Sequence, residues 1–186
     1  MTLASMPGPS GAARSQRILT LTAFGTAREV AALLEAKGPL LASGLSLTRQ
    51  QPLPPDAVPQ RALQAPRVSL TPGCRGLLLT VPVDPGVPLP NGGCWGEALG
   101  AWRLPTLVLL RAEQLHTGWP AAATALLNHH RVPLVGLLQC GGDWVGERRR
   151  QDGLPWLGHL DGDSESTERM LFLVLDRWQR ILRSLC

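Results

Sequence analysis

The sequence predicts a single three-layer α/β domain, in which a mostly parallel sheet has helices on both faces. Short apolar runs alternate with helical stretches along most of the chain, which is the pattern of βαβ units. Runs such as 77–81 and 106–110 are continuously apolar, as in parallel strands that are buried on both faces. The length of 186 residues suits one domain better than two.

The first ordered elements follow a tail. Residues 1–16 are rich in Gly, Ser, Ala and Pro, and we expect a flexible N-terminal tail ahead of a domain over 17–186. Residues 17–22 form a β-rich run that ends at Gly25. The pattern then predicts a helix over 26–37 that closes at Gly38-Pro39.

A proline-rich stretch interrupts the alternation at residues 46–73. It follows a short apolar run, 40–42, and the dipeptide Ser43-Gly44. Because proline breaks helices and central strands, we expect an irregular insertion here. Its prolines are Pro52, Pro54, Pro55, Pro59, Pro66 and Pro72.

From Gly76 the alternation of strand and helix resumes. The segment 164–185 is the clearest element, an amphipathic helix with acidic residues at its start and arginines near its end. Predicted strands are 77–81, 106–110, 132–138 and 156–160, and predicted helices are 95–102, 115–130 and 164–185. In such folds ligands lie beyond the carboxyl ends of the strands. The loops to inspect are therefore 23–29, 43–44, 83–90, 111–116 and 139–143.

Composition narrows the function classes. The net charge of +4 comes almost entirely from arginine, with Lys37 the only lysine, and no basic run carries interleaved aromatic residues. We therefore expect no nucleic-acid partner, and we expect Arg148–Arg150 to lie in a solvated loop. No apolar run is long enough to cross a membrane and no secretory signal precedes the domain, so a cytoplasmic location is expected. Four widely spaced cysteines predict no metal site.

The turn after the first strand carries a family resemblance. Residues 25–33, Gly-Thr-Ala-Arg-Glu-Val-Ala-Ala-Leu, resemble the G-T-D-x-x-V-G-K-T motif of the ATP-dependent dethiobiotin synthetases, a branch of the P-loop NTPases. Residues 39–44 resemble the family's K-P-V-x-S-G, and Val87-Pro88-Leu89 matches the end of V-E-G-A-G-G-x-x-V-P-L. Further resemblance lies at 104–109, 132–138 and 155–160, so that it covers roughly Ile18 to Leu160. It implies a P-loop NTPase-like fold.

The matching residues include none of those that carry the family's chemistry. The second glycine, the lysine and the hydroxyl residue of the phosphate-binding motif are replaced by Ala31, Ala32 and Leu33, and the family's glutamate by Thr80. Glycine amides, an ammonium group and a magnesium-binding hydroxyl are what hold a triphosphate. No residue is therefore assigned a catalytic role. The resemblance implies only a vestigial nucleotide site, at Gly25, Thr26, Glu29, Val30, Ser43 and Gly44.

Glu29 and a few cations decide whether a phosphate could still bind. Thr26 and Glu29 have the spacing of a capping box, in which the carboxylate competes with phosphate for the first amides of the helix. Alternatively, Glu29 points to solvent. Arg28 or Arg111 could replace the lost lysine as a phosphate fork, whereas Lys37 is expected to be a solvated side chain.

Other candidate side chains have structural interpretations of their own. Asp84, Asp143 and Asp161 follow predicted strands, where a carboxylate either holds Mg²⁺ or, more commonly, caps a turn. The adjacent His129 and His130 end a helix and do not have the spacing of metal ligands. Either of His116 and His159 could line a loop edge, but neither has a Cys, Ser or carboxylate partner in the sequence. Two interpretations stay open for Trp95, Trp102 and Trp144, which either fill the core or anchor an interface.

These observations lead to one functional hypothesis with two alternatives. The hypothesis is a catalytically silent relative of dethiobiotin synthetase that binds a protein partner or small ligand and needs no cofactor. One alternative is an active synthetase with a remodelled site, which would use ATP and Mg²⁺ to close the ureido ring of dethiobiotin. The other is a non-catalytic interaction subunit, since the family resemblance also implies a dimer.

Overall fold

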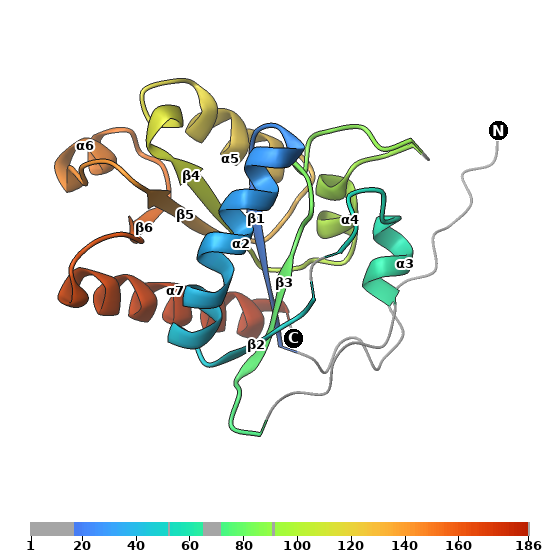
Figure 1. Ribbon diagram of the computed structural model, residues 1–186, viewed down its shortest axis with the longest axis horizontal. Helices are drawn as coiled ribbons and strands as arrows, with labels where there is room; N and C mark the ends of the chain where they lie inside the picture. The colour runs from blue at the N-terminus through green and yellow to red at the C-terminus, as the bar shows by residue number, and fades with distance from the viewer. Residues whose placement is uncertain (1–16, 52, 65–71, 91, 186) are drawn as a thin grey trace.

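A computed structural model describes residues 17–51, 53–64, 72–90 and 92–185 (Figure 1). The predicted tail, residues 1–16, lies outside the described residues. The core of the molecule is a six-stranded sheet with the order β2-β3-β1-β4-β5-β6, in which every neighbouring pair is parallel. The strands are β1 (Ile18–Ala23), β2 (Leu47–Arg49), β3 (Gly76–Thr80), β4 (Thr106–Arg111), β5 (Leu134–Cys140) and β6 (Trp156–His159). The prediction of an α/β class with a parallel sheet is confirmed.

Helices cover both faces of this sheet because the side chains of each strand alternate between two apolar cores. In β1, Leu19 and Leu21 face a core shared with α2 and α7, whereas Ile18 faces a core shared with α3, α4 and α5. Figure 1 shows α2 lying across β1, with α7 next to it. The helices are α2 (Ala27–Gly44), α3 (Pro59–Gln64), α4 (Trp95–Ala101), η1 (Ala112–Gln114), α5 (Trp119–His129), α6 (Gly146–Gln151) and α7 (Ser164–Leu185).

The first helix is longer than predicted. It runs through Pro39 to Gly44 instead of closing at Gly38-Pro39. Proline removes one helical hydrogen bond, but it lies on the exposed side of α2, where water can solvate the freed carbonyl group. On the opposite side Leu41 and Ala42 are buried in the core, and their burial favours continuing the helix.

The expectation of an irregular segment at 46–73 is wrong only in part, whereas the expectation of a loop at Arg148–Arg150 is wrong. The proline-rich segment 46–73 contains β2, a three-residue edge strand that ends before the first proline, and α3, which starts with Pro59 at a position where a missing N–H costs nothing. Residues 52 and 65–71 of this segment lie outside the described residues. Arg148–Arg150 belong to α6 rather than to a loop, and Arg149 is buried.

The remaining boundaries shift by a few residues. The helix predicted over 115–130 is α5, which begins four residues later, after the separate short helix η1. The strand predicted over 132–138 is β5, displaced by two residues. The helix predicted over 164–185 is confirmed as α7, and its buried residues are Met170, Val174 and Trp178. In the described parts of the chain, no helix combines the length and the apolar character needed to pass through a lipid bilayer.

Candidate functional site

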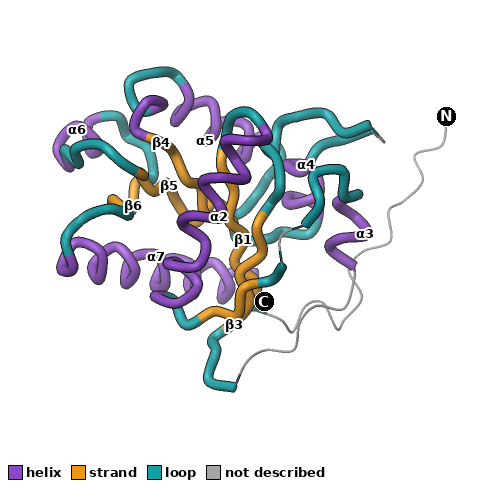
Figure 2. Tube along the Cα trace, viewed as in Figure 1, coloured by secondary structure: helices purple, strands orange, loops and turns teal. Residues whose placement is uncertain are grey.

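The topology marks one position on the sheet where loops diverge. Strand β1 lies between β3 and β4. The chain leaving β1 enters α2 on one face, whereas the chains leaving β3 and β4 lead to α4 and α5 on the other. Open α/β sheets bind ligands at such a switch point. Figure 2 traces in teal the loops that leave β1 and β3 toward the end of the molecule where α2 begins.

The residues gathered there form what we call the switch-point cluster. They come from the turn after β1 and the first turn of α2, from the loop after β3, and from the end of β4 and η1. The cluster consists of Phe24, Gly25, Thr26, Glu29, Asp84, Arg111 and Gln114.

The turn between β1 and α2 is closed by a capping box. Gly25 adopts φ +133°, which favours glycine, and Thr26 is the N-cap of α2. The amide of Glu29 donates to Thr26 Oγ1 (3.4 Å), and the amide of Thr26 donates to Glu29 Oε2 (2.9 Å). The Thr26 hydroxyl also donates to Glu29 Oε2, at 2.8 Å. The predicted capping box is confirmed, and Glu29 turns back on its own helix rather than pointing to solvent.

Arg111 completes the neutralisation of Glu29. Its Nη1 lies 2.7 Å from Glu29 Oε1, and its backbone amide donates to Gln114 Oε1 at 2.9 Å. The hydrogen bond from Arg111, followed by those from Thr26, lowers the pKa of Glu29 from 4.5 to about 2. Arg111, a candidate phosphate fork from the sequence, is thus bonded to a carboxylate of the same chain.

A second carboxylate holds the other side of the turn. Asp84 is 7% exposed, and its Oδ2 accepts a hydrogen bond from the amide of Gly25 at 3.0 Å while its Oδ1 accepts one from Gly86 at 2.8 Å. On the third side Gln114 Nε2 donates to the carbonyl oxygen of Phe24 at 2.8 Å. The amides of Gly25 and Thr26, which an incoming phosphate would use, are therefore already bonded to carboxylates.

The structure separates the predicted vestigial residues into two groups. Gly25, Thr26 and Glu29 meet in the switch-point cluster, and Val30 is buried beneath it in the core. Ser43-Gly44 does not join them, because α2 continues to Gly44 and carries this dipeptide about 24 Å along its axis from Ala27. The expectation that Ser43-Gly44 forms a loop at the carboxyl edge of the sheet is wrong.

Lys37 is paired rather than solvated. Its Nζ forms an ion pair with Asp161 in the loop after β6, and Asp161 Oδ2 also accepts a hydrogen bond from the Gly141 amide at 2.7 Å. Burial raises the pKa of Asp161, but the hydrogen bonds from Lys37 and Gly141 outweigh it, so that the pKa lies below its ordinary value. The ion pair joins α2 to the loops after β5 and β6, so Lys37 has a structural role.

Two buried polar side chains, Gln139 of β5 and Arg149 of α6, were not predicted from the sequence. Gln139 is fully buried, and its Nε2 donates to the carbonyl oxygens of Gly141 and Asp143, both at 3.0 Å. Its Oε1 accepts a hydrogen bond from Arg149 Nε at 3.3 Å. No sequence signal marked Arg149, because it stands in a run of three arginines that has the composition of a solvated surface.

The other candidate residues do not form a catalytic or metal-binding arrangement that the geometry supports. Among the described residues, no group of three or more His, Cys, Asp or Glu side chains is placed to hold a metal ion. His130 Nε2 lies 3.7 Å from Cys94 Sγ, and its ring stacks edge-on against His129. Trp95 is fully buried, so it fills the core, whereas Trp144 is 37% exposed.

Comparison with known proteins gives no family assignment. A scan against models of protein families finds none that matches this chain, and a sequence search of curated proteins finds no matching relative. The functional interpretation therefore depends on the geometry of the described residues.

Proposed function

We propose that this chain is a degenerate relative of the ATP-dependent dethiobiotin synthetases that has lost ATP chemistry and acts as a binding or regulatory protein. One observation carries the proposal: the amides of Gly25 and Thr26 are bonded to the chain's own carboxylates. In a P-loop the equivalent donors are free for phosphate oxygens, and the surrounding charge is positive.

The residues that would have to restore nucleotide binding are absent from the turn. Ala32 stands where the resemblance places the lysine, and it is an exposed methyl group on α2. Leu33 stands where the family has a magnesium-binding hydroxyl, and it packs against the core. A triphosphate at this turn would meet Asp84 and Glu29, two carboxylates, with only Arg111 of opposite charge bonded in the cluster.

The order of the elements also favours the proposal. A parallel sheet with β1 at its centre, followed by a tight glycine turn and a long helix, suits the P-loop NTPase-like architecture that the motif order implies. The matched segments at 104–109, 132–138 and 155–160 fall on β4, β5 and β6 in the same order.

The test is nucleotide binding and turnover by the pure protein. A ligand that binds the native state raises the melting temperature. We expect no ATP binding, so millimolar ATP with Mg²⁺ should leave the melting temperature unchanged. We also expect no phosphate release and no dethiobiotin formation from the diamine substrate, CO₂ and ATP. Phosphate release or dethiobiotin formation that is abolished in Arg28→Ala or Arg111→Ala would overturn the proposal in favour of an active enzyme with a remodelled site.

A further inference from the structure

The strongest unassigned feature lies away from the switch-point cluster, at the outer edge of the sheet. Strand β6 is the last strand in the sheet order. A cavity of about 580 Å³ opens beside it, with lining residues from α6, β6 and α7. This volume falls within the range of small-molecule sites, roughly 300–1,000 Å³.

The lining of this edge cavity has a one-sided charge. It includes three arginines and a histidine, and none of its lining residues is an aspartate or a glutamate. The charged and aromatic side chains of the lining are Trp144, Arg149, Arg150, Trp156, His159 and Arg169. Two carboxylates outside the lining lie near these arginines, since Glu165 is 3.7 Å from Arg169 and Asp152 is 3.9 Å from Arg149. The lining itself is cationic, which favours an anionic occupant.

Arg149 is the most informative of these residues, because its charge is buried and incompletely neutralised. The side chain is 5% exposed, and its Nε donates to the uncharged Gln139 Oε1. The carboxylate paired with it is that of Asp152, whose Oδ2 lies 3.9 Å from Arg149 Nη1, beyond hydrogen-bond distance. That carboxylate already accepts hydrogen bonds from Trp156 Nε1 at 2.8 Å and from the Leu154 amide at 3.0 Å. Buried charges are normally paired and hydrogen-bonded, so an anion in the cavity would complete the pairing.

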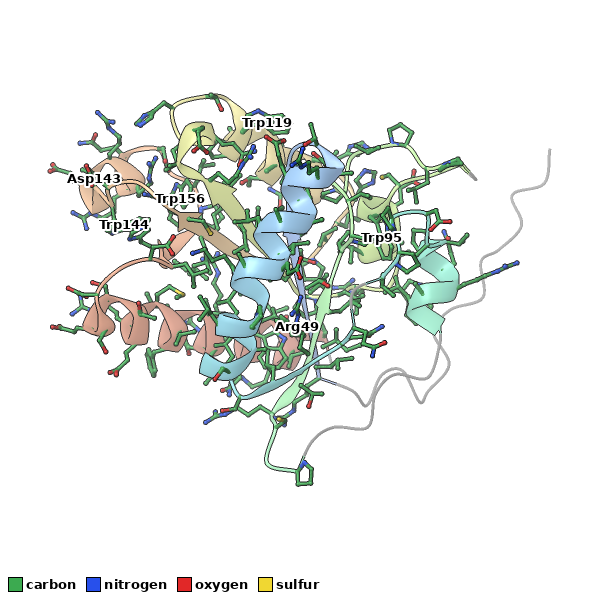
Figure 3. All side chains as sticks on the ribbon, in the orientation of Figure 1. Arg49, Trp95, Trp119, Asp143, Trp144 and Trp156 are labelled. Carbon is green, nitrogen blue, oxygen red and sulfur yellow. The ribbon has the colours of Figure 1, made fainter. Side chains whose placement is uncertain are left out.

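The rest of the lining suits a flat, apolar body. Trp144 and Trp156 lie edge to face with ring centroids 6.3 Å apart, and the Arg149 guanidinium lies 4.9 Å from the Trp156 ring centroid. Figure 3 shows the two labelled tryptophans close together near α6 and β6. Leu157 and Met170 add aliphatic surface to the lining. Aromatic rings pack favourably against such walls.

One further polar group in the lining lacks a partner. The Nε2 atom of His159 is buried and makes no hydrogen bond among the described residues. A buried ring nitrogen without a partner is costly, and a ligand oxygen in the cavity would provide one. His159 is one of the lining residues of the cavity, so it adds a second polar side chain to that of Arg149.

We propose that the edge cavity binds a small aromatic carboxylate, with the carboxylate directed to the Arg149 guanidinium and the ring packed against Trp144 and Trp156. Arginine pairs with carboxylates through two parallel hydrogen bonds, which gives orientation as well as attraction. The proposal involves residues outside the switch-point cluster, so it stands whether or not ATP binds there.

The test compares two probes of the same shape and different charge by isothermal titration calorimetry. We expect 2-naphthoate to bind with one-to-one stoichiometry, and 2-naphthamide, which lacks the charge, to bind at least about 10-fold more weakly, as expected for a hydrogen-bonded charge. If neither probe binds at millimolar concentration, or if both bind equally well, the proposal is wrong.

Substitutions in the lining test whether 2-naphthoate binds in the edge cavity. Arg149→Met should weaken 2-naphthoate binding about 10-fold or more, and Arg150→Glu, a charge reversal at an exposed position in the lining, should do so without disturbing the fold. Trp144→Ala should weaken both probes. Arg28→Ala, which removes one charge from an exposed position on α2, is the matched control and should leave affinity within twofold. If Arg149→Met does not fold, Arg150→Glu decides, and unchanged affinity in that folded variant overturns the proposal.

Discussion

Replacing Asp84 by alanine should destabilise the protein by about 3 kcal/mol. The substitution removes two hydrogen bonds to a carboxylate that is 7% exposed, one from Gly25 at 3.0 Å and one from Gly86 at 2.8 Å. A hydrogen bond to a charged group contributes about 1.5–3 kcal/mol. Because both amides lie in loops that water can enter once the carboxylate is gone, we expect the lower part of the summed range.

The assay is urea unfolding at neutral pH, followed by circular dichroism and analysed by linear extrapolation. A loss of about 3 kcal/mol corresponds to a fall of about 6–12 °C in the melting temperature of a chain of this size. Asp84→Asn keeps an acceptor oxygen and should lose about half as much. The matched control is Asp143→Ala, because Asp143 is an exposed aspartate in the loop after β5, labelled in Figure 3, and its loss should change stability by less than about 0.5 kcal/mol.

The result that would refute this reasoning is a loss below about 1 kcal/mol for Asp84→Ala. It would mean that the Gly25 amide is solvated equally well without the carboxylate. The switch-point cluster would then be less firmly closed than its geometry implies, and the proposed loss of phosphate binding would lose its main support.

Three further predictions test other parts of the structure. Because the pKa of Glu29 is lowered in the folded state, its ionised carboxylate stabilises the fold fully above pH 4.5, and this stabilisation is lost as the pH falls toward about 2. The difference in unfolding free energy between wild type and Glu29→Gln should therefore shrink over that pH range in urea unfolding. A constant difference would contradict the assignment. Gly100→Ala should cost several kcal/mol, on the order of 3, because a Cβ there would lie 1.8 Å from the carbonyl oxygen of His130, whereas Gly118→Ala has open space and should be neutral or slightly stabilising in the same melts. Trp178→Phe should cost about 1–3 kcal/mol, since it removes a buried indole and its hydrogen bond to a carbonyl group of β1; an unchanged denaturation midpoint would argue against that bond.

Much of the sheet was predictable from the sequence because buried parallel strands are continuous apolar runs. Strands β3 and β4 lie close to their predicted limits. Gly38-Pro39 predicts an earlier end of α2 than the structure has, because an apolar stripe continues past the proline. That stripe, Val30, Leu34, Leu41 and Leu45, keeps helical spacing through the proline, and all four residues are buried.

The candidate site was predictable only in part. The capping box of Thr26 and Glu29 is local, so its spacing in the sequence was sufficient to predict it. The contacts of Asp84 and Gln114 depend on β3 and β4 being the two neighbours of β1, which a single sequence does not specify. The burial of Arg149 depends in the same way on where α6 packs, and the run of arginines gave the opposite indication.

The hydrogen bond between Trp178 Nε1 and the carbonyl oxygen of Ile18 has a consequence for synthesis of the chain, since it joins residues 160 positions apart. As the polypeptide leaves the ribosome, the side of the sheet that α7 will cover has only α2 as a partner until Ser164–Leu185 is made. At about 5–20 residues per second, the interval between the completion of α2 and the completion of α7 lasts roughly 10–30 s. During it, this side of the sheet carries an uncovered apolar surface to which a chaperone could bind, and the core on this side is completed only when α7 has been made.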